Sequence, residues 1–199
     1  MPRPSRLLSS GGFTIAFTTS LLLLADGRPA RDIDLTDNAL CIVAPATPYD
    51  PASGQPMYAP RPIPADARCP VCGMYPARYP RWAAQVIFKN GATHYFDSPV
   101  NLFDFLHKVE RYDRRYTRAD VAVSDVRDLA SGQWIEAGQA FFVHGSDVAG
   151  PMRNADLPAF DSRATADAFA RLHRGTVLTA SDMTPQLLAP LSRNGRHRH

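Results

Sequence analysis

The chain has 199 residues, of which 45% are hydrophobic and 21% are charged, and its formal net charge is +3. This length supports one ordinary domain, or two small ones, with a packed core. The weak positive charge, with no run of Lys or Arg interleaved with aromatic residues, excludes the electrostatic footprint of a nucleic-acid-binding protein.

Residues 1–31 predict a targeting segment. A basic stretch, MPRPSR, is followed by residues 7–25, which carry no charged side chain. A positive segment before an apolar one is typical of a secretory signal peptide, and about 20 apolar residues also suffice to span a bilayer. We expect export, with a cleaved signal favoured over an N-terminal membrane anchor. No cysteine follows the apolar run directly, so a lipid anchor is not expected.

Residues 32–65 are rich in proline and show no sustained hydrophobic period. Such a composition is typical of a linker or an extended arm. Cys41 lies in this segment, and no motif explains it. We expect the folded part of the chain to begin near Asp66.

Residues 66–126 predict a first β-β-α-β module that opens with a hairpin. Two β-type runs, at 84–88 and 93–97, flank an Asn-Gly pair. This dipeptide between two such runs is typical of a tight hairpin turn.

A helix and a strand complete the first module. Ser98 is a favourable N-cap, and Pro99 suits the first position of a helix. Apolar side chains then recur on one helical face through Val109. A β-type run at 119–126 predicts the third strand.

Residues 127–192 repeat the same order of elements. Strands are expected at 132–137, 139–146 and 175–179, and helices at 162–173 and 181–191. Residues 193–199 form a polar tail. We therefore predict an α+β fold in which two tandem ββαβ modules pack as one globular unit, preceded by a signal segment and a Pro-rich arm.

Cys69 and Cys72 form a C-x-x-C pair, which places two thiols within reach of one metal ion or of each other. This spacing leaves open a disulfide, a redox-active dithiol, half of a zinc site and a soft-metal site. Zinc needs four ligands, and no second Cys or His pair is present. A thioredoxin-type motif opens a helix after a strand, whereas this pair precedes the predicted hairpin.

Two methionines extend the candidate site. Met74 follows the second thiol across Gly73, whose conformational freedom lets the backbone turn tightly. Met152 lies in the loop GSDVAGPMRN rather than on a helical stripe. Thiolate and thioether ligands select Cu(I), so a Cu(I) site is our hypothesis. His94, on the second predicted strand, fits a structural or solvent-facing role better than a ligand role.

The chain carries no motif of a hydrolase or of a phosphate-binding loop, such as G-x-S-x-G or H-E-x-x-H. The carboxylates Asp97, Asp104, Asp125 and Asp147 are dispersed, and no two of them pair as general acid and base. These observations favour binding over catalysis, and we expect a protein that is not an enzyme.

Residues 68 to about 190 resemble the NosL family, the nitrous oxide reductase accessory proteins. The most specific parts are CPVCGM at 69–74 and the loop GSDVAGPM at 145–152. The resemblance implies two linked ββαβ modules and a periplasmic copper chaperone. Such a chaperone binds Cu(I) and passes it to the copper-enzyme assembly machinery or to apo nitrous oxide reductase.

The resemblance also implies ligands. Cys72, Met74 and Met152 match the core of the family's site, with Cys69 alongside and His94 as a weaker member. Many family members are lipoproteins, and this chain departs from that pattern, because its first cysteine, Cys41, does not directly follow the apolar run. Arg153 follows the last methionine where the family often has glycine, which puts a charge beside the proposed ion.

Two rival functions belong to other classes. One is a periplasmic thiol-disulfide oxidoreductase that uses the C-x-x-C pair, and the other is an interaction module stapled by zinc. Among partners we expect no nucleic acid. We include membrane association through the N-terminus and a homodimer that shares one metal site between two copies.

Overall fold

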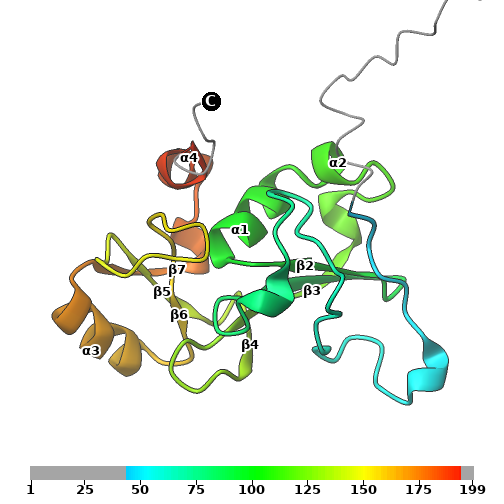
Figure 1. Ribbon diagram of the computed structural model, residues 1–199, viewed down its shortest axis with the longest axis horizontal. Coiled ribbons are helices and arrows are strands. Elements are labelled where there is room, and N and C mark those ends of the chain that lie inside the picture. The colour runs from blue at the N-terminus through cyan, green and yellow to red at the C-terminus, as the bar shows by residue number, and fades with distance from the viewer. Residues whose placement is uncertain (1–43, 194–199) are drawn as a thin grey trace, which may run out of the picture. The chain divides into compact units, whose positions relative to one another are not determined.

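The computed structural model describes residues 44–193. The strands are β1 (Ala84–Phe88), β2 (Thr93–Phe96), β3 (Val121–Arg127), β4 (Trp134–Glu136), β5 (Phe141–His144), β6 (Ala159–Phe160) and β7 (Thr176–Thr179). The helices are α1 (Pro99–His107), α2 (Val109–Tyr112), α3 (Arg163–His173) and α4 (Pro185–Arg193). Two antiparallel sheets with helices packed on them (Figure 1) confirm the predicted α+β class.

The first sheet has the strand order β2-β1-β3-β4, and every neighbouring pair is antiparallel. The predicted β1-β2 hairpin is confirmed. Gly91 in its turn has φ 80°, and Asn90 Oδ1 accepts a hydrogen bond from Ala92 N at 3.1 Å. Because β2 ends at Phe96, the next residue, Asp97, lies directly before the N-terminus of α1.

Helix α1 begins where the sequence predicts. Ser98 Oγ accepts a hydrogen bond from Asn101 N at 3.4 Å, and Pro99 takes the first helical position. The helix is shorter than expected, because Lys108 leaves helical geometry at φ −145° and α2 starts as a separate turn. Every residue of α1 except its last, His107, is buried, since the helix packs against both β1 and α4.

The second sheet has the order β6-β5-β7, and its membership differs from the prediction. Strand β4 pairs with β3 of the first sheet rather than with β5. Trp134 of β4 stacks there on Arg127 of β3, whose guanidinium carbon lies 3.9 Å from the ring centroid. The place beside β5 that was expected for β4 is instead taken by β6. Strand β6 has only two residues, which are too few to show a hydrophobic period.

Helix α3 covers the second sheet. Ser162 Oγ caps it by accepting a hydrogen bond from the backbone N–H three residues on, at 3.2 Å, as its sequence predicts. Phe169 packs against Phe160 of β6, with ring centroids 5.0 Å apart. A hydrogen bond of 2.8 Å from Leu129 N to Ala159 O joins the two sheets, and side chains from both contribute to one hydrophobic core.

Residues 44–65, which lie in the segment predicted to be a linker or arm, pack on the first sheet. Thr47 pairs with Thr93 on the outer edge of β2 through two backbone hydrogen bonds of 2.8 Å. Arg61 N donates to Gln85 Oε1 at 3.2 Å, and the Arg61 guanidinium donates to Thr93 Oγ1 at 2.6 Å. Every residue of β1 and β2 is buried, because this segment covers the face of the sheet opposite α1. The folded part therefore begins before Asp66.

Several predictions from the sequence fall outside the described residues. They are the signal segment 1–31, Cys41 and nearly all of the polar tail 193–199. Within residues 44–193, no helix combines the length and the apolar composition that crossing a bilayer requires.

Replacing Arg61 by Ala should lower the free energy of unfolding by roughly 1.5–3 kcal/mol, because hydrogen bonds from a charged group are lost and part-buried acceptors are left without a donor. Arg171→Ala, at an exposed position of α3, should cost less than about 0.5 kcal/mol. Urea unfolding of both variants beside the wild type measures this difference. Equal losses would contradict a specific role for the packed segment.

Candidate metal centre

Cys69 and Cys72 lie on a tight loop that its own backbone closes. Cys69 N donates to Met74 O, and Gly73 N donates to Cys69 O, both at 2.9 Å. Gly73 has φ 75°, a left-handed conformation that glycine adopts without steric cost. Both cysteines are free thiols. Cys69 is 1% exposed and Cys72 is half-buried, so the second thiol is the more accessible of the two.

A carboxylate that the sequence did not single out completes the cluster. Asp97, at the end of the hairpin, is 0% exposed, and its Oδ1 lies 3.1 Å from Cys72 Sγ. Asn101 Nδ2 donates to Asp97 Oδ1 at 2.9 Å and lies 3.4 Å from the same sulfur. One ligand atom from each of Cys69, Cys72 and Asp97 falls within 4.8 Å of the others, so the three can hold one metal ion.

The electrostatics of the cluster favour a bound cation. Asp97 Oδ2 is buried and has no hydrogen-bond partner among the described residues, which is costly for a carboxylate oxygen. The hydrogen bond with Cys69, burial and the nearby charge of Asp97 raise the pKa of the Cys72 thiol far above its ordinary value. A proton on Cys72 and a metal ion are therefore alternative partners for this carboxylate.

A pocket of about 410 Å³ opens beside the cluster. Cys72 lines it from the cysteine loop, and Met152 lines it from the segment between β5 and β6, while α1 and α4 contribute other walls. The sequence indicated these two candidate sulfur ligands separately. The structure brings them to one pocket although they are far apart along the chain.

Met152 sits in a closed turn. Arg153 N donates to Gly150 O at 2.9 Å, and Gly150 N donates to Asn154 O at 2.8 Å. Pro151 occupies the second position of the turn, where its fixed φ is favourable. The location of Met152 at a loop tip, expected from the surrounding glycines and proline, follows from this pair of hydrogen bonds.

Asp156 anchors the same loop to the first module. Its Oδ1 accepts a hydrogen bond from Leu157 N at 2.8 Å and a long one from Val100 N, at the start of α1, at 3.5 Å. Burial raises the pKa of Asp156 to about 7. Gly150 packs on this side chain so closely that a Cβ at Gly150 would lie 2.4 Å from Asp156 Oδ2.

Met74 stays beside the cluster through its backbone. Its carbonyl oxygen accepts the hydrogen bond from Cys69 N, and its side chain is half-buried. It is not among the residues that line the pocket. The structure thus places Cys72 and Met152 on one pocket with Cys69 behind them, and Met74 next to them on the loop.

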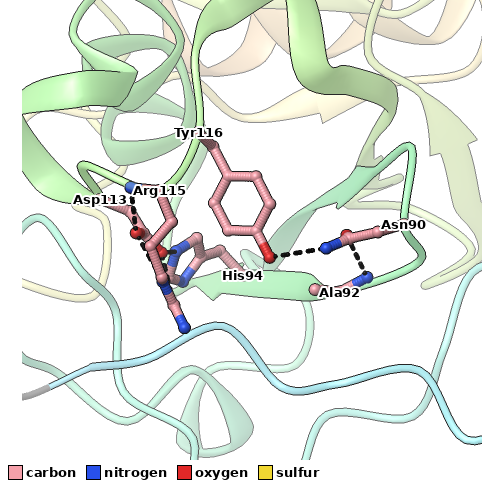
Figure 2. A network of polar contacts seen from close by, with 6 residues as sticks. All are labelled: Asn90, Ala92, His94, Asp113, Arg115 and Tyr116. Carbon is pink, nitrogen blue, oxygen red and sulfur yellow. Dashed lines mark hydrogen bonds and ion pairs between the residues drawn. The ribbon is translucent and has the colours of Figure 1, made fainter.

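The structure does not bring His94 into the cluster. Its side chain is 1% exposed, its Nε2 lies 3.0 Å from Asp113 Oδ2, and its ring packs on Phe88 and Phe105. Figure 2 shows Arg115 on the same carboxylate, with Nη2 at 2.7 Å from Oδ2. Burial lowers the pKa of His94 despite the opposing effect of Asp113 and so favours the neutral imidazole. His94 therefore has a structural role, because it links β2 to the segment after α2.

Asp97, Asn101 and Asp156 are the site residues that sequence reasoning missed. A signal existed for the first two, because Asp97 directly precedes the N-cap Ser98 and Asn101 lies in the first turn of the helix. Both side chains therefore emerge from one helix N-terminus. No local signal marked Asp156, since its role depends on a distant backbone N–H.

The ligand atoms of this site suit a soft metal ion that the protein can pass to a partner. Thiolates and a thioether select Cu(I), whereas a structural zinc site is usually enclosed by four ligands of which most are Cys or His. No histidine of residues 44–193 joins the cluster of two thiols and one carboxylate. The half-buried Cys72, on an open pocket, leaves room for an incoming ligand.

Two antiparallel sheets around one core, with this cluster beside a pocket, define an α+β protein with a candidate soft-metal site. The family model NosL matches residues 60–188, and the chain therefore belongs to the NosL family. The crystal structure of the copper chaperone NosL from Shewanella denitrificans is similar to it, with 25% sequence identity and a TM-score of 0.55 over 66% of this chain and 99% of that chain. No match was found among curated proteins.

The contribution of His94 to stability should fall as the pH drops below about 6.5, the ordinary pKa of histidine, whereas Asp156, whose pKa is raised to about 7, contributes stability as it takes up a proton over the same range. The pKa of His94 is lowered in the folded state, so the unfolded chain binds a proton that the folded chain does not. Protonation of this single group in the unfolded chain lowers the free energy of unfolding by up to about 1.4 kcal/mol for each unit by which the pH falls. Urea unfolding of the wild type and of His94→Gln at pH 7.5 and 5.5 isolates the effect of His94, because the wild type should lose more stability on acidification than the variant does. The pKa of Asp113 is also lowered, and its contribution is lost only at more acidic pH.

Gly150→Ala should lower the free energy of unfolding by roughly 1–3 kcal/mol, because the added Cβ overlaps Asp156 and forces the Met152 loop to shift. Gly138→Ala is the matched control, since a Cβ there meets only Glu136 Oε1, at 3.7 Å. Thermal or urea unfolding of the pair tests the packing of this loop. Indistinguishable stabilities would mean that the close approach of Gly150 to Asp156 is not needed.

Proposed function

We propose that this chain is a Cu(I) metallochaperone, with the ion as its cargo. The observation that carries the proposal is the dithiol–Asp97 cluster beside a pocket that Met152 also lines. Membership in the NosL family and the likeness to a copper chaperone of known structure support it. A carrier needs to bind and release a metal, and it needs no catalytic group.

Each sulfur ligand has a distinct role in this proposal. Cys69, at 1% exposure, is the inner anchor, and Cys72 is the thiolate on the pocket. Met152 supplies a thioether from across the pocket, and Met74 is a further thioether on the cysteine loop. One Cu(I) displaces the thiol protons when it binds. Asp97, held by Asn101, offers an oxygen ligand beside the two sulfurs.

Transfer would proceed by ligand exchange. A site with few and soft ligands lets a Cys, Met or His of the partner enter before the donor ligands leave. Cys72 and Met152 are both half-buried on the pocket, so they are the ligands that an incoming group meets first. A closed tetrahedral site would exclude that group.

The client and the compartment complete the proposal. Family membership favours delivery to nitrous oxide reductase or to its copper-assembly machinery. The basic and then uncharged N-terminus favours export to the periplasm, with membrane association through the same segment if it is retained.

The rival functions receive less support from the site. A thioredoxin-type pair opens a helix after a strand, whereas Cys69 and Cys72 lie on a backbone-closed loop before β1. A zinc staple needs four ligands, and within residues 44–193 the cluster has two thiols and one carboxylate.

Anaerobic competition of the reduced full chain against a chromogenic Cu(I) chelator tests the proposal. We expect one tight equivalent of Cu(I). Met152→Ala should weaken binding at least about tenfold, since even the outer partners of metal ligands affect affinity on that scale. Cys72→Ser should weaken it further, because it removes a thiolate. Met57→Ala, at a side chain 38% exposed and outside the pocket, is the matched control and should leave the affinity unchanged.

A parallel titration with Zn(II) decides between metals. Weak Zn(II) binding beside tight Cu(I) binding is the expected result. Tight Zn(II) binding, together with a Cu(I) affinity indifferent to Met152, would overturn the copper proposal in favour of the zinc module.

A further inference from the structure

Basic side chains stand on the wall of the pocket that holds Cys72 and Met152. Lys108, at the end of α1, and Arg111, in α2, both line this pocket and are exposed. Lys108 keeps 44% of its side chain accessible even though its Nζ lies 2.7 Å from Asp104 Oδ1. A protein that approaches the pocket would therefore meet these two positive charges.

The cysteine loop contributes two more cations. Arg68 Nη1 donates to Gly73 O at 3.2 Å, so its guanidinium lies on the loop itself. The guanidinium carbons of Arg68 and Arg78 lie 4.3 and 4.7 Å from the ring centroid of Tyr75. Contact with one aromatic ring holds both charges in place. Both arginines are exposed.

Arg153 adds a charge directly after Met152. It is exposed and has φ 57°, a left-handed conformation that is uncommon for a residue other than glycine. The hydrogen bond from Arg153 N to Gly150 O fixes this backbone at the end of the turn. The backbone of Arg153 therefore has a defined place beside the proposed ligand.

The carboxylates that line the pocket are buried. Asp104 and Asp156, the acidic residues on the pocket wall, are 8% and 7% exposed, and Asp97 of the cluster is 0% exposed. Asp104 also accepts hydrogen bonds from Lys108, at 2.7 Å, and Tyr112, at 2.6 Å. The acids on the pocket wall are thus buried while the cations beside it are exposed, and positive charge predominates at the approach to the pocket even though Asp66, Glu110 and Asp147 are exposed on neighbouring segments. The whole chain has a net charge of only +3.

We propose that these exposed cations form a docking surface for an acidic face of the protein that exchanges Cu(I) with this chain. The basic rim, as we name it, consists of Arg68, Arg78, Lys108, Arg111 and Arg153. The inference rests on the proposed function, because ligand exchange requires a brief complex in which the partner's ligand enters the pocket. Complementary charges speed such encounters and set their orientation.

The test compares two acceptor peptides with the same Met and His ligands for Cu(I), one flanked by Glu residues and the other by Gln residues. Stopped-flow mixing with the Cu(I)-loaded full chain measures the transfer rate to each. At low ionic strength the Glu peptide should receive Cu(I) about tenfold faster, on the scale of electrostatic steering. The advantage should shrink as added salt shortens the Debye length.

Two variants with equal changes of charge locate the effect. Arg111→Gln with Arg153→Gln, on the basic rim, should remove most of the advantage of the Glu peptide. Arg118→Gln with Arg171→Gln, at exposed positions that do not line the pocket, should preserve it. The equilibrium affinity of each variant for Cu(I), measured separately, distinguishes slower docking from altered binding.

Each outcome is decisive. Equal rates to both peptides in the wild type, or an equal loss in the two double variants, would overturn the docking surface while leaving the copper carrier intact. Failure of the wild-type chain to load Cu(I) would instead refute the proposed function, and the docking surface with it.

Discussion

The contact between the Asp97 carboxylate and the Cys72 thiol is the constraint around which the candidate site is organised. Sulfur and oxygen lie 3.1 Å apart, and the other oxygen of this fully buried carboxylate has no hydrogen-bond partner among the described residues. Asp97 lies at the end of the β1-β2 hairpin, directly before the N-cap Ser98 of α1. Asn101, in the first turn of this helix, donates a hydrogen bond to the Asp97 carboxylate. A buried carboxylate oxygen without a hydrogen-bond partner costs free energy. A bound cation would remove this cost, so the arrangement is well suited to hold a cation.

The second module contributes the Met152 loop to the site, and its helix α4 forms part of the pocket wall. Gly150 and Asp156 fit together closely, and Asp156 also reaches the start of α1, so the loop that carries Met152 is fixed relative to the cysteine side of the pocket. The charged groups that line the pocket divide by sign, with the carboxylates buried and the cations exposed. The inner groups suit metal binding, and the outer ones suit an acidic partner.

The sequence predicted elements that depend on neighbours along the chain. The Asn-Gly turn, the caps Ser98 and Ser162 and the position of Met152 at a loop tip all follow from residues within a few positions of one another. Features set by distant contacts were missed or misassigned. The pairing of β4 with β3 needed the whole sheet. The engagement of His94 by Asp113 joins positions 19 residues apart, and the contact between Val100 and Asp156 joins positions 56 apart.

Methyl-labelled methionine provides the most direct measurement of the central claim. The chain has five methionines, so a carbon–proton spectrum of protein labelled at the methionine methyl group gives five assignable signals. On addition of one equivalent of Cu(I) without oxygen, the account predicts that the Met152 signal shifts while those of Met57 and Met183 stay in place. A Met152 signal that does not move while Cu(I) binds tightly would contradict the claim that this loop and the cysteine loop hold one ion between them.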